Sequence, residues 1–242
     1  MNLAIDVGNT FTKTALFHND ELVSYLVSEK VTDAIRLANQ DQVKQIIIAS
    51  VGTDISHYLN LIENRDRITV LDKETILPFN INYDNRTTLG VDRIAAVSGG
   101  LRLFPKRNLL VIDMGTCVTF DFIDQHNTYQ GGAISPGMHM RFKAMHQYTA
   151  KLPLINVPSD TINVLGKSTQ ECLESGVVHG LIAEIDYQIR VYKKIYDNLQ
   201  VIVCGGDATF FEKKISEDIL LCQELVMLGL NSILQYNNAA NP

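Results

Sequence analysis

Two stretches of the sequence repeat one pattern and decide how the chain is organised. Residues 3–17 read LAIDVGNTFTKTALF, and residues 110–122 read LVIDMGTCVTFDF. In each stretch an apolar run ends in an aspartate, a glycine follows two positions later, and a second strand-like run begins. Asp6 and Asp113 lie 107 positions apart, which is nearly half of the 242-residue chain. The simplest interpretation is two similar units, each of which opens with the same hairpin.

The rest of the chain alternates strand and helix patterns. We expect strands at 2–7, 11–18, 21–27, 45–50, 67–71, 109–114, 117–124, 129–134 and 199–204. We expect helices at 30–40, 54–64 and 91–104, from Pro136 to Ala150, from Thr169 to Tyr196, and at 223–237. Such alternation predicts an α/β fold. Residues 105–108, PKRN, form the best linker, so we predict an N-terminal lobe over residues 1–107 and a C-terminal lobe over residues 108–242.

Composition excludes several classes of protein. The net charge is −6 and no basic run occurs, so nucleic acid is not an expected partner. No stretch approaches the roughly 20 apolar residues that span a bilayer, and the N-terminus lacks the features of a signal peptide. The four cysteines, at positions 117, 172, 204 and 222, form no CxxC pair. We therefore expect a cytoplasmic protein with reduced thiols and no membrane partner.

The turn after each repeated aspartate has residues suited to binding phosphate. Gly8 and Gly115 let the main chain bend sharply, and consecutive N–H groups in such a turn form a concave site for anions. Thr10 and Thr116 add hydroxyl donors. The aspartates repel phosphate, so a cation is expected between carboxylate and phosphate.

A simpler alternative is two ordinary hairpins whose aspartates cap their turns. A third segment, Gly205-Gly206-Asp207, follows another apolar strand and could admit a base or ribose against bare main chain. By itself this segment is equally typical of a strand-to-helix turn in which Asp207 is the N-cap. Two phosphate turns and this third segment together favour nucleotide binding.

Six motifs in a fixed order give the sequence a family resemblance. They are the run from Asp6 to Lys13, Gly90-Val91-Asp92-Arg93, Asp113-Met114-Gly115-Thr116, residues 131–137 (GGAISPG), Ser168-Thr169, and Gly205-Gly206-Asp207-Ala208. With these motifs the chain resembles the type III pantothenate kinases, within the superfamily of acetate and sugar kinases, heat-shock chaperones and actin. The resemblance implies duplicated ribonuclease H-like (actin-like ATPase) domains that form two lobes with a central cleft.

The resemblance also implies a reaction and its residues. ATP would phosphorylate the primary hydroxyl of pantothenate to give 4′-phosphopantothenate, the first step of coenzyme A biosynthesis. The implied ATP-binding residues are Asp6, Val7, Gly8, Asn9, Thr10, Phe11, Thr12, Lys13 and Thr116. The implied proton acceptor is Asp92, and the implied pantothenate contacts are Tyr83, Gly90, Val91, Asp92, Arg93 and Thr169. Asp113 would hold K⁺ or NH₄⁺, Mg²⁺ would accompany ATP, and the enzyme would be a homodimer.

Two other functions stay open on sequence alone. One is a kinase of the same superfamily with another small-molecule substrate, and the other is a nucleotide-binding regulator without catalysis. Asp92 favours an enzyme, because a non-catalytic protein needs no proton acceptor. The helix expected from Thr169 carries an apolar stripe that could face either the core or a partner subunit: Leu173, Val177, Leu181, Ile185, Ile189 and Ile195.

Overall fold

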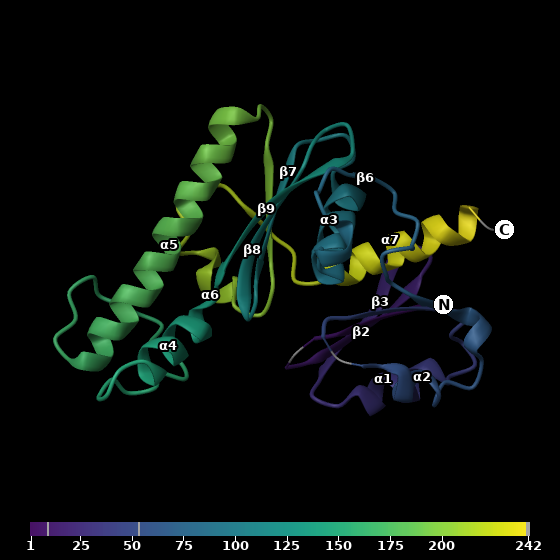
Figure 1. The fold of residues 1–242 in the computed structure, drawn as a ribbon, viewed down its shortest axis with the longest axis horizontal. Coiled ribbons are helices and arrows are strands. Elements are labelled where there is room, and N and C mark those ends of the chain that lie inside the picture. The colour runs from purple at the N-terminus through teal and green to yellow at the C-terminus, as the bar shows by residue number, and fades with distance from the viewer. Residues whose placement is uncertain (9, 53, 241–242) are drawn as a thin grey trace. The chain divides into compact units, whose positions relative to one another are not determined.

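The computed structural model describes residues 1–8, 10–52 and 54–240, which form two compact units (Figure 1). The first unit comprises Met1–Lys106, Ile123–Gly131 and Glu224–Pro242, and the second comprises Arg107–Phe122 and Gly132–Gln223. The chain leaves the first unit at the expected linker. The first unit also takes in residues 123–131 and the C-terminal segment, which we expected in the C-terminal lobe. The boundary of the two predicted lobes at 107/108 stays a prediction.

The first unit is built on a five-stranded sheet in the order β3-β2-β1-β4-β5. Its strands are β1 (Asn2–Val7), β2 (Thr12–His18), β3 (Glu21–Ser28), β4 (Gln45–Ser50) and β5 (Ile68–Val70). β1 runs antiparallel to β2 and parallel to β4. The run QIIIAS forms β4, whose four central residues are buried as the sequence predicted. The central strand β1 therefore ends with Asp6 and Val7 at the start of the first turn.

The other sheet repeats this order. Its arrangement is β11-β10-β7-β8-β9-β6, so β7 to β11 occupy the places that β1 to β5 occupy in the first sheet. Its strands are β6 (Asn80–Ile81), β7 (Leu109–Met114), β8 (Cys117–Ile123), β9 (Thr128–Pro136), β10 (Gln200–Cys204) and β11 (Leu220–Leu221). β6 is an addition, and it pairs with Thr128 and Tyr129, the first residues of β9. The repeated order confirms the predicted duplicated ribonuclease H-like fold.

Most predicted helices form, with differences at their ends. The helices are α1 (Val31–Ala38), α2 (Ser56–Leu59), α3 (Val91–Leu103), α4 (Met138–Gln147), α5 (Thr169–Ile195), α6 (Ala208–Glu212) and α7 (Leu225–Ala240). The 3₁₀ turns are η1 (Arg65–Arg67) and η2 (Arg86–Thr88). The expectation that Pro136 opens a helix was wrong, because Pro136 ends β9. The N–H of Gly137 donates to the carbonyl of Thr116 at 3.1 Å and keeps the chain extended there, so α4 begins at Met138.

The C-terminal helix α7 packs closely against α3 within the first unit (Figure 1). Two glycines permit the close approach: a Cβ on Gly229 would lie 1.8 Å from the carbonyl oxygen of Ala95, and a Cβ on Gly99 would lie 2.1 Å from that of Leu225. Neither distance is compatible with any side chain, so these glycines set how near the two helices can come.

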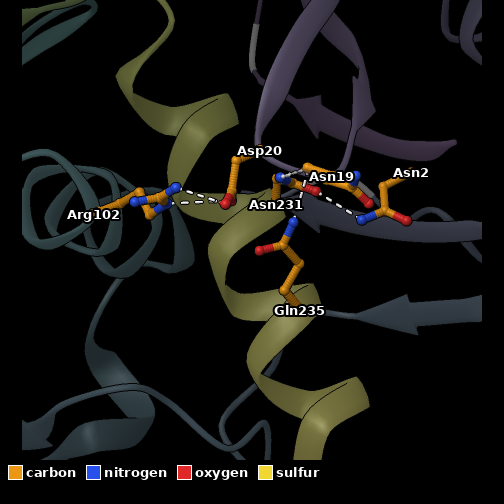
Figure 2. A network of polar contacts seen from close by, with 6 residues as sticks. All are labelled: Asn2, Asn19, Asp20, Arg102, Asn231 and Gln235. Carbon is orange, nitrogen blue, oxygen red and sulfur yellow. Dashed lines mark hydrogen bonds and ion pairs between the residues drawn. The ribbon is translucent and has the colours of Figure 1, made fainter.

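A polar network ties α7 to the sheet of the first unit (Figure 2). The side-chain amides of Asn231 and Gln235 both donate to the carbonyl oxygen of Asn19, at 2.8 Å each. Asn2 on β1 donates to the side-chain oxygen of the buried Asn231 at 2.9 Å. The last helix of the chain thus completes the unit that the first residues begin. Among the residues that the structure describes, no helix combines the length and the apolar character needed to cross a membrane.

Candidate functional site

The turn between β1 and β2 joins the first two strands of the first unit. Its aspartate, Asp6, is 8% exposed and pairs with Lys13 in the register of the two strands. The N–H of Gly8 donates to the carbonyl of Phe11 at 3.0 Å, and Thr10 and Phe11 are exposed. Polar and main-chain groups of the turn therefore face solvent while its aspartate is enclosed.

The other predicted residues of this turn differ in accessibility. Val7 and Thr12 are both 3% exposed, so only their main-chain atoms are candidates for contact with a nucleotide. The predicted residue Asn9 lies outside the described residues.

The turn between β7 and β8 is the corresponding feature of the second unit. Asp113 stands at the same place in β7 as Asp6 in β1, and it pairs with Cys204 across to β10. The N–H of Gly115 donates to the carbonyl of Cys117 at 2.9 Å, which closes a tighter loop than the one at Gly8. Thr116, at the tip, is exposed.

Two further main-chain segments of the second unit lie against this turn. A Cβ on Gly137 would lie 2.3 Å from the carbonyl oxygen of Gly115, and the N–H of Asp207 donates to the carbonyl of Met114 at 2.9 Å. Gly205 has φ +98° and therefore a conformation that favours glycine. The predicted phosphate turn and the predicted Gly-Gly-Asp turn are thus brought together. Gly137, which ends the motif over residues 131–137, lies against them, although the sequence predicted no role for it.

Asp113 forms one side of a small cradle. A Cβ on Gly205 would fill it, at 2.4 Å from Oδ1 of Asp113 and 2.5 Å from the carbonyl oxygen of Met114. Oxygen atoms of this kind are the ligands that hard cations prefer. In the described ranges no three His, Cys, Asp or Glu side chains cluster as possible metal ligands. Oδ1 of Asp113 and the carbonyl oxygen of Met114 are therefore the oxygen atoms that this turn could offer to a cation.

Asp207 has a charged neighbour that the sequence did not indicate. Its carboxylate lies 3.5 Å from Nε2 of His139, near the start of α4. Burial raises the pKa of Asp207, and the interaction with His139 partly opposes that rise. The Asp207 side chain makes no capping hydrogen bond to α6, so the N-cap interpretation of its side chain is not supported. His139 could have been suspected only from its position after the Pro-Gly that precedes α4.

The predicted proton acceptor lies at the start of α3 in the first unit. Gly90 is the N-cap, and Oδ1 of Asp92 accepts a hydrogen bond from the N–H of Arg93 at 2.9 Å. A Cβ on Gly90 would lie 2.4 Å from that Oδ1, so only glycine leaves the carboxylate its position. The N-terminus of a helix favours a negative charge. Arg93 is itself only 7% exposed.

Tyr83 lies between β6 and η2, also in the first unit. Its ring is 38% exposed and lies against Gly131, whose Cβ would meet the ring at 3.6 Å. It lines a cavity of about 360 Å³ formed by residues between positions 74 and 86. The structure thus gives Tyr83 an open, cavity-facing position, consistent with a substrate contact.

Thr169 is the first residue of α5 in the second unit and is exposed. Ser168 before it caps the helix, since its Oγ accepts from the N–H of Glu171 at 3.2 Å. The apolar stripe of α5 is mostly core: of its members, only Ile195, at 64% exposed, is outside. The stripe therefore packs within its own unit and is not a partner-binding face.

Comparisons with known proteins identify the family to which this sequence is similar. A family model described as type III pantothenate kinase matches residues 2–191. A type III pantothenate kinase from Flavobacterium psychrophilum is 38% identical over 242 residues, covering 98% of this chain and 99% of the relative.

Solved structures share the fold at lower identity. One, from Campylobacter jejuni and named for the Baf transcriptional activator family, has TM-score 0.65 and 20% identity over 98% of this chain and 99% of the other. An inorganic polyphosphate/ATP-glucomannokinase from Arthrobacter has TM-score 0.51 and 12% identity over 97% and 98%. The family match over most of the chain and the near full-length identity to a named relative lead to one conclusion: the chain belongs to the type III pantothenate kinase family.

Proposed function

We propose that this protein transfers the γ-phosphoryl group of ATP to the primary hydroxyl of pantothenate, which forms 4′-phosphopantothenate in the first step of coenzyme A biosynthesis. Family membership supports the substrate and the reaction class. The observation that carries the proposal is the start of α3, where bare Gly90 leaves room for the Asp92 carboxylate. A carboxylate at this position can accept a proton, and a binding protein without catalysis needs no proton acceptor.

The phosphates of ATP are bound by main-chain groups of the two repeated turns. In the first turn these are the groups from Asp6 to Lys13, with Val7 and Thr12 contributing through the main chain because their side chains are buried. In the second turn the exposed Thr116 adds a hydroxyl donor. Phosphoryl transfer depends mainly on positioning and on neutralising charge, which fits a site built of N–H groups and a lysine.

Asp113 holds K⁺ or NH₄⁺, and Mg²⁺ accompanies ATP. The cradle of Asp113 and Met114 oxygens supports the first assignment. When bound, the cations offset the negative charge that carboxylate and phosphates bring together.

Asp92 accepts the proton of the pantothenate hydroxyl as the new bond to phosphorus forms. Tyr83, Gly90, Val91, Arg93 and Thr169 contact pantothenate. Tyr83 does so from the cavity, and Arg93 does so from the first turn of α3, where it follows Asp92.

The active protein is a cytoplasmic homodimer. Its four cysteines form no CxxC pair, which is usual for proteins of a reducing compartment. The face of α5 opposite the core offers a subunit contact, because Gly176 and Gly180 are exposed there and a Cβ on either would have no neighbour within 4 Å.

A coupled assay of ADP release tests the proposed function. Pantothenate with ATP, Mg²⁺ and K⁺ should give rapid ADP release, and sugars or acetate in its place should not. Nucleotide binding without turnover on any acceptor would support the regulator instead. Turnover on a sugar alone would support the other kinases of the superfamily.

The same assay tests the monovalent cation. Replacing K⁺ by Na⁺ at constant ionic strength should reduce the rate strongly, because the smaller ion fits the Asp113 cradle and the phosphate oxygens less well. Equal rates in the two salts would contradict the assignment of Asp113.

A further inference from the structure

Arg141 on α4 joins three elements of the second unit through one side chain. Its Nε donates to the carbonyl oxygen of Pro136 at 2.8 Å, and its Nη2 donates to the hydroxyl oxygen of Ser135 at 2.9 Å. The same Nη2 donates to the carboxylate of Glu184 on α5 and forms an ion pair with it. The guanidinium thus ties α4 both to the end of β9 and to α5.

These contacts are partly sheltered from solvent. The side chains of Arg141 and Glu184 are 21% and 28% exposed. Hydrogen bonds to charged groups are stronger than those between neutral groups. A guanidinium is planar and its donors point in fixed directions, so it holds several acceptors at set positions, which a lysine ammonium on its flexible stem cannot do. Arginine at this position therefore supplies fixed geometry as well as charge.

The segment that Arg141 holds lies directly against the turn between β7 and β8. Pro136 is followed by Gly137, whose N–H donates to the carbonyl of Thr116 at 3.1 Å. A Cβ on Gly137 would lie 2.3 Å from the carbonyl oxygen of Gly115 and 2.6 Å from that of Thr116, so the two main chains touch. A shift at Pro136 and Gly137 would therefore reach Thr116, the proposed contact of an ATP phosphate.

Apolar packing contributes little to the position of this segment. Ile134, just before it, is 62% exposed, and Pro136 is exposed as well. Of the ten residues of α4, only Met138 and Phe142 are buried. The end of β9 and the start of α4 therefore depend on hydrogen bonds for their position, among them those of Arg141.

The first turn of α4 also contacts the Gly-Gly-Asp turn. Nε2 of His139 lies 3.5 Å from the Asp207 carboxylate, and the N–H of Asp207 donates to the carbonyl of Met114 at 2.9 Å. The start of α4 and the residues just before it thus lie against both turns of the second unit that the sequence predicts for a nucleotide.

We propose that Arg141 is a positioning residue, which holds the turn between β7 and β8 in the place where it binds the phosphates of ATP. The inference rests on the nucleotide-binding part of the proposed function. The effect of Arg141 passes through Pro136 and Gly137 to Thr116, so Arg141 needs no contact of its own with ATP. A misplacement of about 1 Å can cost on the order of 100-fold in rate, so a small shift of the turn is enough to weaken the site.

The test measures the Kd of ATP by calorimetry, and kcat with the KM of each substrate, for the wild type and two variants. Arg141→Gln should raise both the Kd and the KM for ATP by about 10- to 100-fold, with the KM for pantothenate within about threefold. Arg141→Lys keeps the charge for Glu184 but loses the planar array of donors, so it should fold normally and raise both values for ATP by about 3- to 10-fold. Arg141→Lys alone decides if Arg141→Gln does not fold.

The matched control is Lys193→Gln, which removes a positive charge from α5 of the same unit, where Lys193 pairs with Glu217 at 2.8 Å. It should leave the Kd of ATP and kcat unchanged. A folded Arg141→Lys with the wild-type Kd and KM for ATP, or an equal rise in KM for both substrates, would overturn the positioning role. A wild type that binds ATP but releases no ADP with pantothenate would remove the proposed reaction, and the Kd values of the variants would still decide the role of Arg141.

Discussion

The carboxylate of Asp92 is held in place by its own helix. Because it accepts a main-chain hydrogen bond at the start of α3, replacing it by asparagine should conserve the local geometry and remove only the proton acceptor. We expect Asp92→Asn to lower kcat by about two to four orders of magnitude with little change in ATP affinity. Steady-state kinetics and nucleotide titration measure the two quantities. Near-normal turnover of the purified variant would remove Asp92 from the mechanism.

Asp207 gives the stability of the fold a predictable pH dependence. Burial raises its pKa in the folded state above the unfolded value of about 3.9. Its stabilising contribution is therefore complete below that unfolded value and is lost as the pH rises through the folded value. Asp207→Asn does not ionise, so it should raise Tm at pH 7 by about 1–4 °C and make little difference near pH 4.

Asp54 provides a control of opposite sign for this measurement. Hydrogen bonds from the side chain and main chain of Ser56 lower its pKa. A lowered pKa stabilises the fold above the unfolded value, so Asp54→Asn should lower Tm at pH 7. Thermal unfolding of both variants at pH 4 and pH 7 checks the pair, and a fall in Tm for Asp207→Asn at pH 7 would contradict the burial argument.

Sequence motifs predicted the place in the fold of three candidate site residues, because each belongs to a local pattern. Asp6, Asp92 and Asp113 each follow or begin such a pattern, and each lies at the strand end or helix start that the pattern indicates. His139 has no such pattern, because its contact with Asp207 joins residues that lie far apart along the chain. Such contacts arise only once the chain has folded.

Regular elements with strong periodicity were predicted well, and short ones were not. β1, β4 and β7 have the predicted bounds, since uninterrupted apolar runs mark them. The helix expected at 54–64 is reduced to the four residues of α2, and the 3₁₀ turn η1 follows after the predicted range. β6 and β11 have two residues each, which is too few to show the alternation of apolar and polar residues that marks a strand. They form because they pair with neighbouring strands.

The contact between α3 and α7 depends on the absence of a side chain at position 229. A methyl group there would lie 1.8 Å from the Ala95 carbonyl oxygen and would force the helices apart. We expect Gly229→Ala to destabilise the protein by about 1–3 kcal/mol, measured by urea unfolding. Asn238→Ala, an exposed change on the same helix, is the control and should alter stability by no more than about 0.5 kcal/mol. Equal effects of the two changes would argue against close packing of α3 and α7.

The duplication of the two sheets was predictable from the sequence. The unit to which the C-terminal helix α7 belongs was not. The two copies of the aspartate turn in the sequence predicted two similar sheets. The two sheets do share one strand order. The C-terminal residues, however, belong to the first unit, because Asn231 and Gln235 satisfy the Asn19 carbonyl (Figure 2). Nothing in the local sequence of α7 indicates which unit it joins, since an apolar helix fits either.

The exposed face of α5 is the proposed contact between the two subunits of the dimer. Gly180 is exposed with nothing within 4 Å of a Cβ, so the subunit itself has room for a large side chain there. If two copies meet through this face, Gly180→Trp should convert the dimer to monomers and lower activity, while far-ultraviolet circular dichroism stays unchanged. Lys44→Trp, an exposed change in the first unit, should leave a dimer. Sedimentation at micromolar concentration decides, and either a monomeric wild type or a dimeric Gly180→Trp would show that α5 does not form the subunit contact.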